Sequence, residues 1–258
     1  MSHKNEATEE ILGWDSLTVG QLVARFPQTA KVFERLGIDY CCDGKRTLQK
    51  AASNKGVEWN GLQEELLETL EAGKEDSSPS WNHASLVALI NHIETTHHQF
   101  IRSESPRLRA LAQKVARVHG PRHPELIGLS EKVEHLFLVL EEHLIEEEKG
   151  FFPLCKKWEE TGMDISLAPR LAFELERLEQ DHHDVGKILE AIHKLTSGYR
   201  LPEDACNSYR ALFHGLEKME KDIHTHVHKE NNIVHGRVMA ALGKEGKFKD
   251  APDFCCRG

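Results

Sequence analysis

Apolar residues recur at helical spacing along most of this chain, and no segment alternates apolar and polar residues in the way a half-buried strand does. Four long segments between residues 82 and 243 each carry one apolar stripe. The stripes consist of Leu86, Leu89, Ile90, Ile93 and Phe100; of Val133, Leu136, Phe137, Leu140 and Leu144; of Leu171, Leu175, Leu178, Val185, Leu189 and Ile192; and of Leu212, Leu216, Met219, Ile223, Val227 and Ile233. Four amphipathic helices with short connections predict an antiparallel four-helix bundle.

The rest of the chain divides around this bundle. Residues 1–74 predict a small domain of short helices, with one helix from Thr18 to Arg25, one from Pro27 to Leu36 and one that begins at Thr47. The segment GIDYCCDGK breaks the helical pattern between the second and the third of these helices. We therefore expect an all-α fold with a helical N-terminal domain (1–74), a polar linker (75–81), the bundle (82–243) and a tail without helical periodicity (244–258).

Histidine and glutamate interrupt the apolar stripes at corresponding places. His143 and Glu147 fall within the second stripe, His182 within the third, and His226 and Glu230 within the fourth. Residues i and i+4 lie on one helical face, and an unpaired buried carboxylate is costly, so these faces predict a metal site. On the first helix, periodicity selects His97, and His98 lies about 100° away at the flank. The same count places other histidines off the stripes: His135, His183, His214, His224, His228 and His235.

Four histidines and two carboxylates suit two divalent ions that share carboxylate oxygens, and mixed nitrogen and oxygen donors favour iron or manganese. A structural zinc would need only four ligands, and calcium would avoid imidazole. A second arrangement uses the Glu-x-x-His pattern of other di-iron bundles, through Glu94 with His97 and Glu179 with His182. That arrangement leaves two inward histidines of the other helices without a role, so we rank it second.

Composition limits the functional classes. The formal net charge of −9 argues against nucleic-acid partners, and no run of about 18 apolar residues is present to span a membrane. The polar N-terminus lacks the apolar core of a signal peptide, so we expect a cytoplasmic protein with reduced cysteines. Cys41 and Cys42 precede a helix N-terminus and are followed by Lys45 and Arg46, an environment expected to favour thiolates. Cys155 and Cys206 have the pattern of core or boundary residues with nothing nearby to activate them.

Several motifs together resemble one family. The segment GIDYCCDGKRTL resembles the N-terminal signature of the repair-of-iron-centres (ScdA-type) proteins, which carry a hemerythrin-like di-iron bundle. The bundle motifs INHIETTHHQFIR, KVARVHGPRHPEL, EEHLIEEEKGFFP, EQDHHDVGKILEAI and HTHVHKENNIV resemble the same family in the same order, so that the resemblance runs from about Leu17 to Met239. It implies two iron ions held by His98, His143, Glu147, His182, His226 and Glu230. The family therefore selects His98 where periodicity selects His97.

The chain departs from the family at three places. After the last ligand motif, relatives tend to have an aromatic-rich ending where this chain has Val234-His235-Gly236. Relatives commonly have glycine where this chain has Asp43, which adds charge near the thiols and is expected to raise their pKa. The terminal pair Cys255-Cys256 is absent from the family pattern, and we interpret it as a tail with incidental thiols.

The resemblance implies repair of iron–sulfur clusters damaged by oxidative or nitrosative stress, with the damaged proteins as partners. In one mechanism the bundle donates iron and Cys41 and Cys42 handle the transfer. In another the site reduces nitric oxide, which would make the protein an enzyme. Two other classes stay open: a non-catalytic binder or sensor of oxygen or nitric oxide, and a helical interaction protein without metal. A homodimer through the N-terminal domain is also left open.

Overall fold

A computed structural model describes residue 14, residues 17–72 and residues 81–241. The predicted tail (244–258), including Cys255 and Cys256, and most of the predicted linker lie outside these residues. Helices are the regular structure of the described part, whose one β interaction is an isolated bridge between Thr18 and Thr47, so the predicted all-α fold is confirmed. None of its helices is both long and apolar enough to cross a lipid bilayer.

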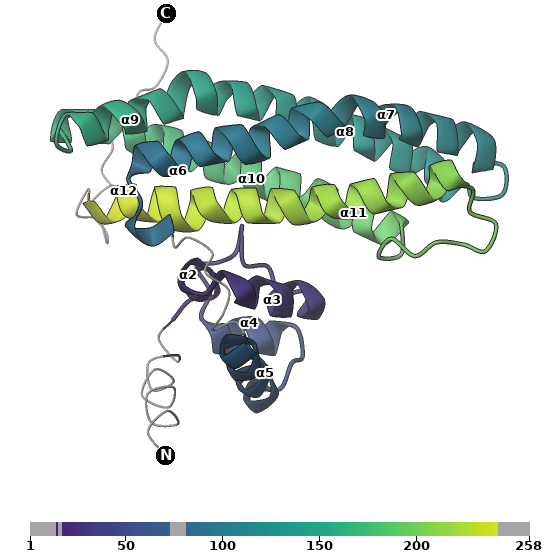
Figure 1. Cartoon of the computed structure of the whole chain (residues 1–258), viewed down its shortest axis with the longest axis horizontal. Helices are drawn as coiled ribbons and strands as arrows, with labels where there is room; N and C mark the ends of the chain where they lie inside the picture. Colours follow the sequence, from purple (N-terminus) through teal and green to yellow (C-terminus); the bar gives the residue numbers. More distant parts are fainter. Residues whose placement is uncertain (1–13, 15–16, 73–80, 242–258) are drawn as a thin grey trace, which may run out of the picture.

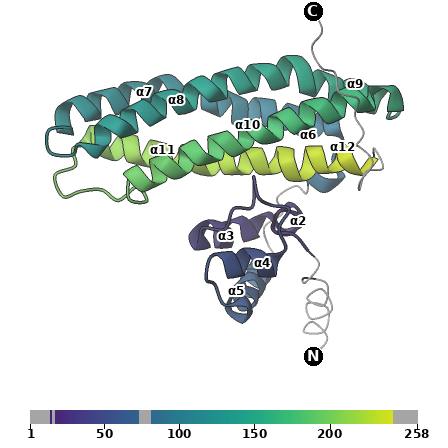
Figure 2. The ribbon, with the colours of Figure 1, turned by 180° about the vertical axis from the view of Figure 1, so that it is seen from behind.

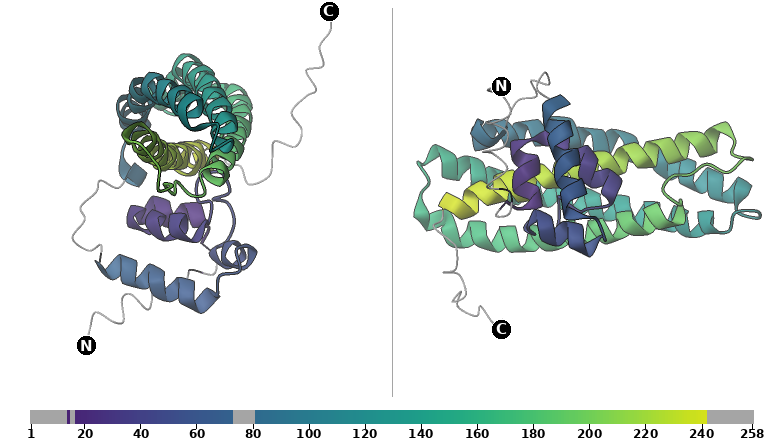
Figure 3. Two further views of the ribbon diagram at one scale, coloured as in Figure 1. Left: turned by 90° about the vertical axis from the view of Figure 1, so that its right-hand side faces the viewer. Right: turned by 90° about the horizontal axis from the view of Figure 1, so that it is seen from below.

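Four long helical rods form the bundle (Figures 1 and 2). The rods comprise α6 (Leu86–Ile93), η5 (Glu94–His98) and α7 (Gln99–His119); α8 (Glu125–Glu146), η6 (Glu147–Phe151) and α9 (Phe152–Glu160); α10 (Ala168–Leu195); and α11 (Asn207–His228), η8 (Lys229–Val234) and α12 (His235–Ala241). Two short 3₁₀ turns, η4 (Trp81–His83) and η7 (Ile165–Leu167), precede the first and third rods. Consecutive rods run in opposite directions, and the view along the bundle in Figure 3 shows them surrounding a common axis.

The apolar core of the bundle is divided into two clusters. One contains residues from α7, α8, the C-terminal half of α10 and α11, and the other contains residues from α6, η6, α9, the N-terminal half of α10, η8 and α12. Buried histidine and glutamate side chains lie between the two clusters. The polar layer thus lies across the middle of a dry core, where each charged group needs a partner.

The N-terminal part contains α2 (Val19–Arg25), η2 (Pro27–Thr29), α3 (Ala30–Leu36), α4 (Leu48–Asn54) and α5 (Trp59–Ala72). Thr18 and Gln21 form a capping box at the start of α2, and the Thr47 side chain caps α4. Gly37 ends α3 in the left-handed conformation, which glycine adopts at little cost. These helices lie beneath α11 and α12 in Figure 1, with α2 packed against η8.

Candidate metal centre

Three of the four rods contain a π-helical segment at the level of the polar layer. His98 ends η5, Glu147 begins η6, and Glu230 is the second residue of η8. A π turn holds one residue more than an α turn and occurs frequently at functional sites. The extra residue rotates the following side chains by about 100° relative to an uninterrupted α-helix. This rotation brings His98 inward, although the helical stripe selected His97.

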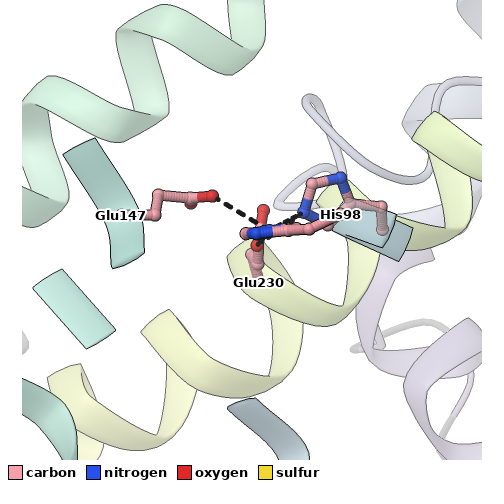
Figure 4. A group of neighbouring side chains, drawn as sticks. His98, Glu147 and Glu230 are labelled. Atoms are coloured by element: carbon pink, nitrogen blue, oxygen red, sulfur yellow. Dashed lines mark hydrogen bonds and ion pairs between the residues drawn. The ribbon is translucent and has the colours of Figure 1, made fainter. Parts of the chain in front are cut away.

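The structure brings all six candidate residues together and buries them, with Glu147 and Glu230 at 0% exposure. In one half of the cluster, the Nε2 atoms of His98 and His226 lie 3.1 Å apart. Glu230 Oε1 lies 2.7 Å from His226 Nε2 and 3.8 Å from His98 Nε2, and Glu147 Oε2 lies 3.4 Å from His98 Nε2. Figure 4 shows the two carboxylates and His98 converging on one point.

The other half repeats this arrangement. The Nε2 atoms of His143 and His182 lie 2.9 Å apart. Glu147 Oε1 lies 3.4 Å from His143 Nε2, and Glu230 Oε2 lies 3.2 Å from His182 Nε2. Each glutamate therefore directs one oxygen toward each histidine pair, so the layer contains two groups of four donors that share both carboxylates.

The electrostatics of the cluster fit a pair of cations. Both Glu147 oxygens and Glu230 Oε2 are buried and have no hydrogen-bond donor among the described residues. Burial opposes the charged form of His98 and of His182, but the neighbouring carboxylates raise the pKa of His98 to about 10 and that of His182 to about 9. Burial also opposes ionisation of Glu230, yet the histidines hold the pKa of that carboxyl well below its usual range. Protons on His98 and His182 thus neutralise the negative charge of the buried carboxylates. Divalent ions bound in the layer would neutralise this charge in place of the protons.

Further polar contacts orient the rings so that Nε2 points into the layer. His98 Nδ1 donates to Glu148 Oε1 at 2.8 Å, and Arg102 holds Glu148 with two hydrogen bonds. His182 Nδ1 donates to Asn231 Oδ1 at 2.8 Å. The Nδ1 atom of His143 lies 3.6 Å from Asp181 Oδ2, an ion-pair distance that is too long for a hydrogen bond. Hydrogen bonds such as those of His98 and His182 fix the tautomer and the ring angle of metal-binding histidines.

His97, Glu94 and Glu179, the residues that only the other predicted assignments use, lie outside the cluster. His97 is buried, but its ring nitrogens contact Asp222 Oδ1 at 3.0 Å and Lys229 Nζ at 2.7 Å. Glu94 accepts a hydrogen bond from Lys156 Nζ at 2.9 Å. Glu179 likewise accepts from a lysine, so neither glutamate of the Glu-x-x-His pattern reaches the polar layer.

Two buried histidines were placed off the stripe by sequence periodicity. His235 is 1% exposed, stacks on His182 with ring centroids 6.0 Å apart, and has no hydrogen-bond partner on either ring nitrogen among the described residues. It follows η8, whose extra residue rotates it inward. His228 is buried because Tyr40 of the N-terminal part covers it, with ring centroids 5.5 Å apart. The π segment and this docking are not visible in helical periodicity.

Cys41 and Cys42 face the bundle close to the metal centre. The Cys42 thiol donates to the backbone oxygen of His182 at 3.4 Å. Hydrogen bonding with Cys42, burial and the charge of Asp39 raise the pKa of Cys41 well above its ordinary value. The expected thiolate is therefore wrong for Cys41.

The cations expected to activate the thiols have other partners. Lys45 pairs with Glu179 at 2.8 Å, and Arg46 pairs with Asp43 at 2.6 Å. The charge of Asp43, expected to raise the thiol pKa, is thus offset by Arg46, and Asp39 acts in its place.

The two remaining described cysteines differ from each other. Cys155 is fully buried in the core, as expected. Cys206 is exposed, and its Sγ lies 3.2 Å from His119 Nε2. The expectation of a core or boundary position is therefore wrong for Cys206, because the loop before α11 leaves it exposed against the end of α7.

Comparison with known proteins agrees with this architecture. Residues 89–238 match the hemerythrin HHE cation binding domain, and residues 15–70 match the ScdA N-terminal domain, which is described as a domain of unknown function. The chain is 32% identical to an iron-sulfur cluster repair protein, YtfE, of Pectobacterium atrosepticum over 86% of its length and 96% of the relative. It is 29% identical to the iron-sulfur cluster repair protein ScdA of Staphylococcus epidermidis, over 85% of its length and 96% of the relative.

A probable iron-sulfur cluster repair protein of Haemophilus influenzae is 31% identical over 86% of this chain and 96% of its own length. The hemerythrin-like domain implies iron binding, and the buried histidine and glutamate groups are suited to hold a metal. The order of the two domains and the similarity over most of both chains lead to one conclusion: this chain belongs to the YtfE/ScdA family of iron–sulfur cluster repair proteins with a hemerythrin-like bundle.

Proposed function

We propose that the bundle holds two iron ions and that the protein donates iron to damaged iron–sulfur proteins in the cytoplasm. The proposed ligands are His98, His143, Glu147, His182, His226 and Glu230. One observation carries the proposal: two fully buried glutamates each direct their two oxygens toward two separate histidine pairs. Two carboxylate-bridged ions would satisfy all of these donors, whereas one ion would leave a histidine pair unused.

Donation of iron is favoured by the contact between the cysteine loop and the cluster. Cys42 contacts the backbone of His182, and Asn231 connects the His182 ring to the Cys41 carbonyl. A protein that only binds a small gas molecule needs the bundle alone. Bound iron would supply redox chemistry and open coordination positions for oxygen or nitric oxide. The protein residues hold the ions, exclude water from them and place two thiols beside one ligand.

The first experiment measures metal content after purification without added metal. We expect about two irons per chain and the optical absorption of an oxygen-bridged diferric site. Replacement of Glu147 or Glu230 by alanine is expected to remove iron while the chain stays helical. A wild-type protein without iron, or with one tightly held zinc, would contradict the proposal.

A second experiment separates donation from nitric oxide reduction. The iron-loaded protein is mixed with an apo iron–sulfur protein and sulfide, and recovery of the cluster is followed by absorption. Donation predicts cluster recovery that is slowed by Cys41→Ser with Cys42→Ser, although the bundle still loads with iron. Nitric oxide reduction predicts that the protein turns over nitric oxide when an electron donor is added, and that this turnover is unaffected by the same double change. Such turnover without any cluster recovery would overturn donation.

A further inference from the structure

The cysteine loop itself carries a group of metal donors outside the bundle. The geometry points to a third metal site, formed by Asp39, Cys41 and Cys42, that takes one thiophilic divalent cation such as Fe²⁺ or Zn²⁺. Its role rests on the proposed iron donation: the loop site receives an ion that has left the bundle and then passes it to a client protein.

The positions of the donor atoms fit one tetrahedral ion. The Sγ atoms of Cys41 and Cys42 lie 3.6 Å apart. Two thiolates bound at about 2.3 Å in tetrahedral geometry would be separated by about 3.8 Å. Asp39 Oδ1 lies 3.2 Å from Cys41 Sγ, and one ligand atom from each of the three residues lies within 4.8 Å of the others. The loop therefore needs little rearrangement to chelate a cation.

The carboxylate of Asp39 is held in place by the backbone. Its Oδ1 accepts hydrogen bonds from the backbone N–H groups of Cys41 and Cys42, both at 2.9 Å. This loop geometry places the carboxylate beside the thiols and leaves Oδ2 available for a cation. A supported ligand of this kind loses little conformational freedom when it binds a metal.

Cys41 is buried, but Asp39 is exposed and Cys42 is half-buried, so solvent reaches this site from one side. Asp39, Cys41 and Cys42 line a pocket of about 660 Å³ between the N-terminal part and the bundle, whose opposite wall includes His183 and His224. Water in the pocket can supply the remaining coordination position. An ion bound here would be accessible to a second protein.

The charges around the loop favour a metal over a reactive thiolate. The neighbouring cations Lys45, Arg46 and Lys187 are paired with Glu179, Asp43 and Asp184. Binding of M²⁺ would form two sulfur–metal bonds and release the two thiol protons to water in the pocket, with no change in oxidation state. Loading would also remove the thiol hydrogen bond from Cys42 to the His182 carbonyl.

One side chain connects the loop with the bundle cluster. Asn231 Nδ2 donates to the Cys41 carbonyl at 3.1 Å, and Asn231 Oδ1 accepts from His182 Nδ1 at 2.8 Å. Because Cys42 also contacts the His182 backbone, the loop touches one proposed ligand of the bundle through two routes. This juxtaposition places the loop site beside one proposed ligand of the bundle.

The test uses the full chain with Cys255→Ser and Cys256→Ser, so that the tail thiols do not bind metal. The bundle is loaded anaerobically with two equivalents of Fe²⁺, excess iron is removed, and Co²⁺ is added as the probe. We expect one cobalt per chain with a sulfur-to-cobalt charge-transfer band. Cys41→Ser with Cys42→Ser should abolish both, while Cys206→Ser, the matched exposed thiol, should change neither.

Asp39→Asn should keep the band but weaken cobalt binding about tenfold or more, because loss even of an outer partner costs about 10–100-fold in metal affinity. Unchanged affinity in this variant, or an absent band in the parent, would overturn the three-donor site. Iron is counted in the same samples. Two retained irons without cobalt binding would refute only the loop site, whereas cobalt binding without iron in the bundle would refute the proposed function.

Discussion

In the proposed metal centre, Glu147 and Glu230 determine whether the polar layer holds one ion or two. Each lies one helical turn after a histidine of the same rod, so its oxygens stand beside that ring and also reach the opposite pair. A carboxylate has two equivalent acceptor oxygens, whereas an amide has only one. The proposed bridging role therefore depends on the carboxylate and not on side-chain length.

This chemistry gives a prediction for Glu230→Gln. The variant has nearly the same volume but one acceptor oxygen, so we expect metal content to fall from about two ions per chain to one or fewer. Far-UV circular dichroism should show unchanged helix content. Glu142→Gln is the matched control, because Glu142 is an exposed residue of α8 next to His143. This variant should keep full metal content. Full occupancy in Glu230→Gln would show that Glu230 does not bridge two ions.

The protonation of His98 and His182 predicts opposite pH dependences for stability and metal binding. Their pKa values in the metal-free fold, about 10 and about 9, exceed the ordinary value of 6.5. Their contribution to stability is therefore complete below about pH 6.5 and is lost as pH rises through 9 to 10. Metal must displace these protons, so metal affinity should rise over the same interval.

Urea unfolding of metal-free protein between pH 7 and pH 10 checks the first part, and proton release during Zn²⁺ binding in weak buffer checks the second. We expect the free energy of unfolding to decrease with pH and about two protons to be released per chain near pH 7. Stability that increases toward pH 10, or binding without proton release, would contradict the protonated cluster.

At the scale of helices, the π segments separate what sequence can predict from what it cannot. The stripes correctly predicted four rods and the inward positions of His143, Glu147, His182, His226 and Glu230. A strict period of 3.6 failed where η5 and η8 add a residue, beside His98 and His235, and at His228, which the N-terminal part covers. Family resemblance selected His98 because it compares motifs and does not depend on helical phase.

The docking of α2 on η8 depends on a close approach that only glycine permits. A Cβ atom at Gly20 would overlap the side chain of Asn232 and lie 3.1 Å from the backbone oxygen of Gly44. Asn232 cannot move away without losing its hydrogen bonds to the carbonyls of Tyr40 and Cys41. Glycine is therefore required at position 20 by the contact between α2 and η8.

We expect Gly20→Ala to destabilise the chain by about 1–3 kcal/mol, the usual cost of overpacking. For a chain of this size, that corresponds to a decrease in Tm of about 2–4 °C per kcal/mol. Gly128→Ala, in α8 with nothing near the added Cβ, should stabilise the helix by about 0.5–1 kcal/mol. Thermal melting of both variants checks the prediction, and an unchanged Tm in Gly20→Ala would show that the interface can adjust.

Across the whole molecule, the polar layer and the N-terminal part form one connected unit. Residues of the N-terminal helices share an apolar cluster with one half of the bundle. The layer that would bind metal separates this cluster from the second one. The sequence predicted both parts but not their contact, because the contact depends on pairs far apart in the chain, such as Cys42 with His182.

This connection predicts that metal in the bundle stabilises the cysteine loop. Metal fixes His182, and Asn231 transmits that order to the Cys41 carbonyl through two hydrogen bonds. Hydrogen exchange at the amides of Cys41 and Cys42 should therefore slow when the bundle is loaded with Zn²⁺. Asn231→Ala should keep protection of the bundle and lose much of the response of the loop. Asn207→Ala, exposed at the far end of α11, is the control and should respond as the wild type does. An equal response of the loop in all three proteins would mean that order reaches it through the shared apolar cluster and not through Asn231.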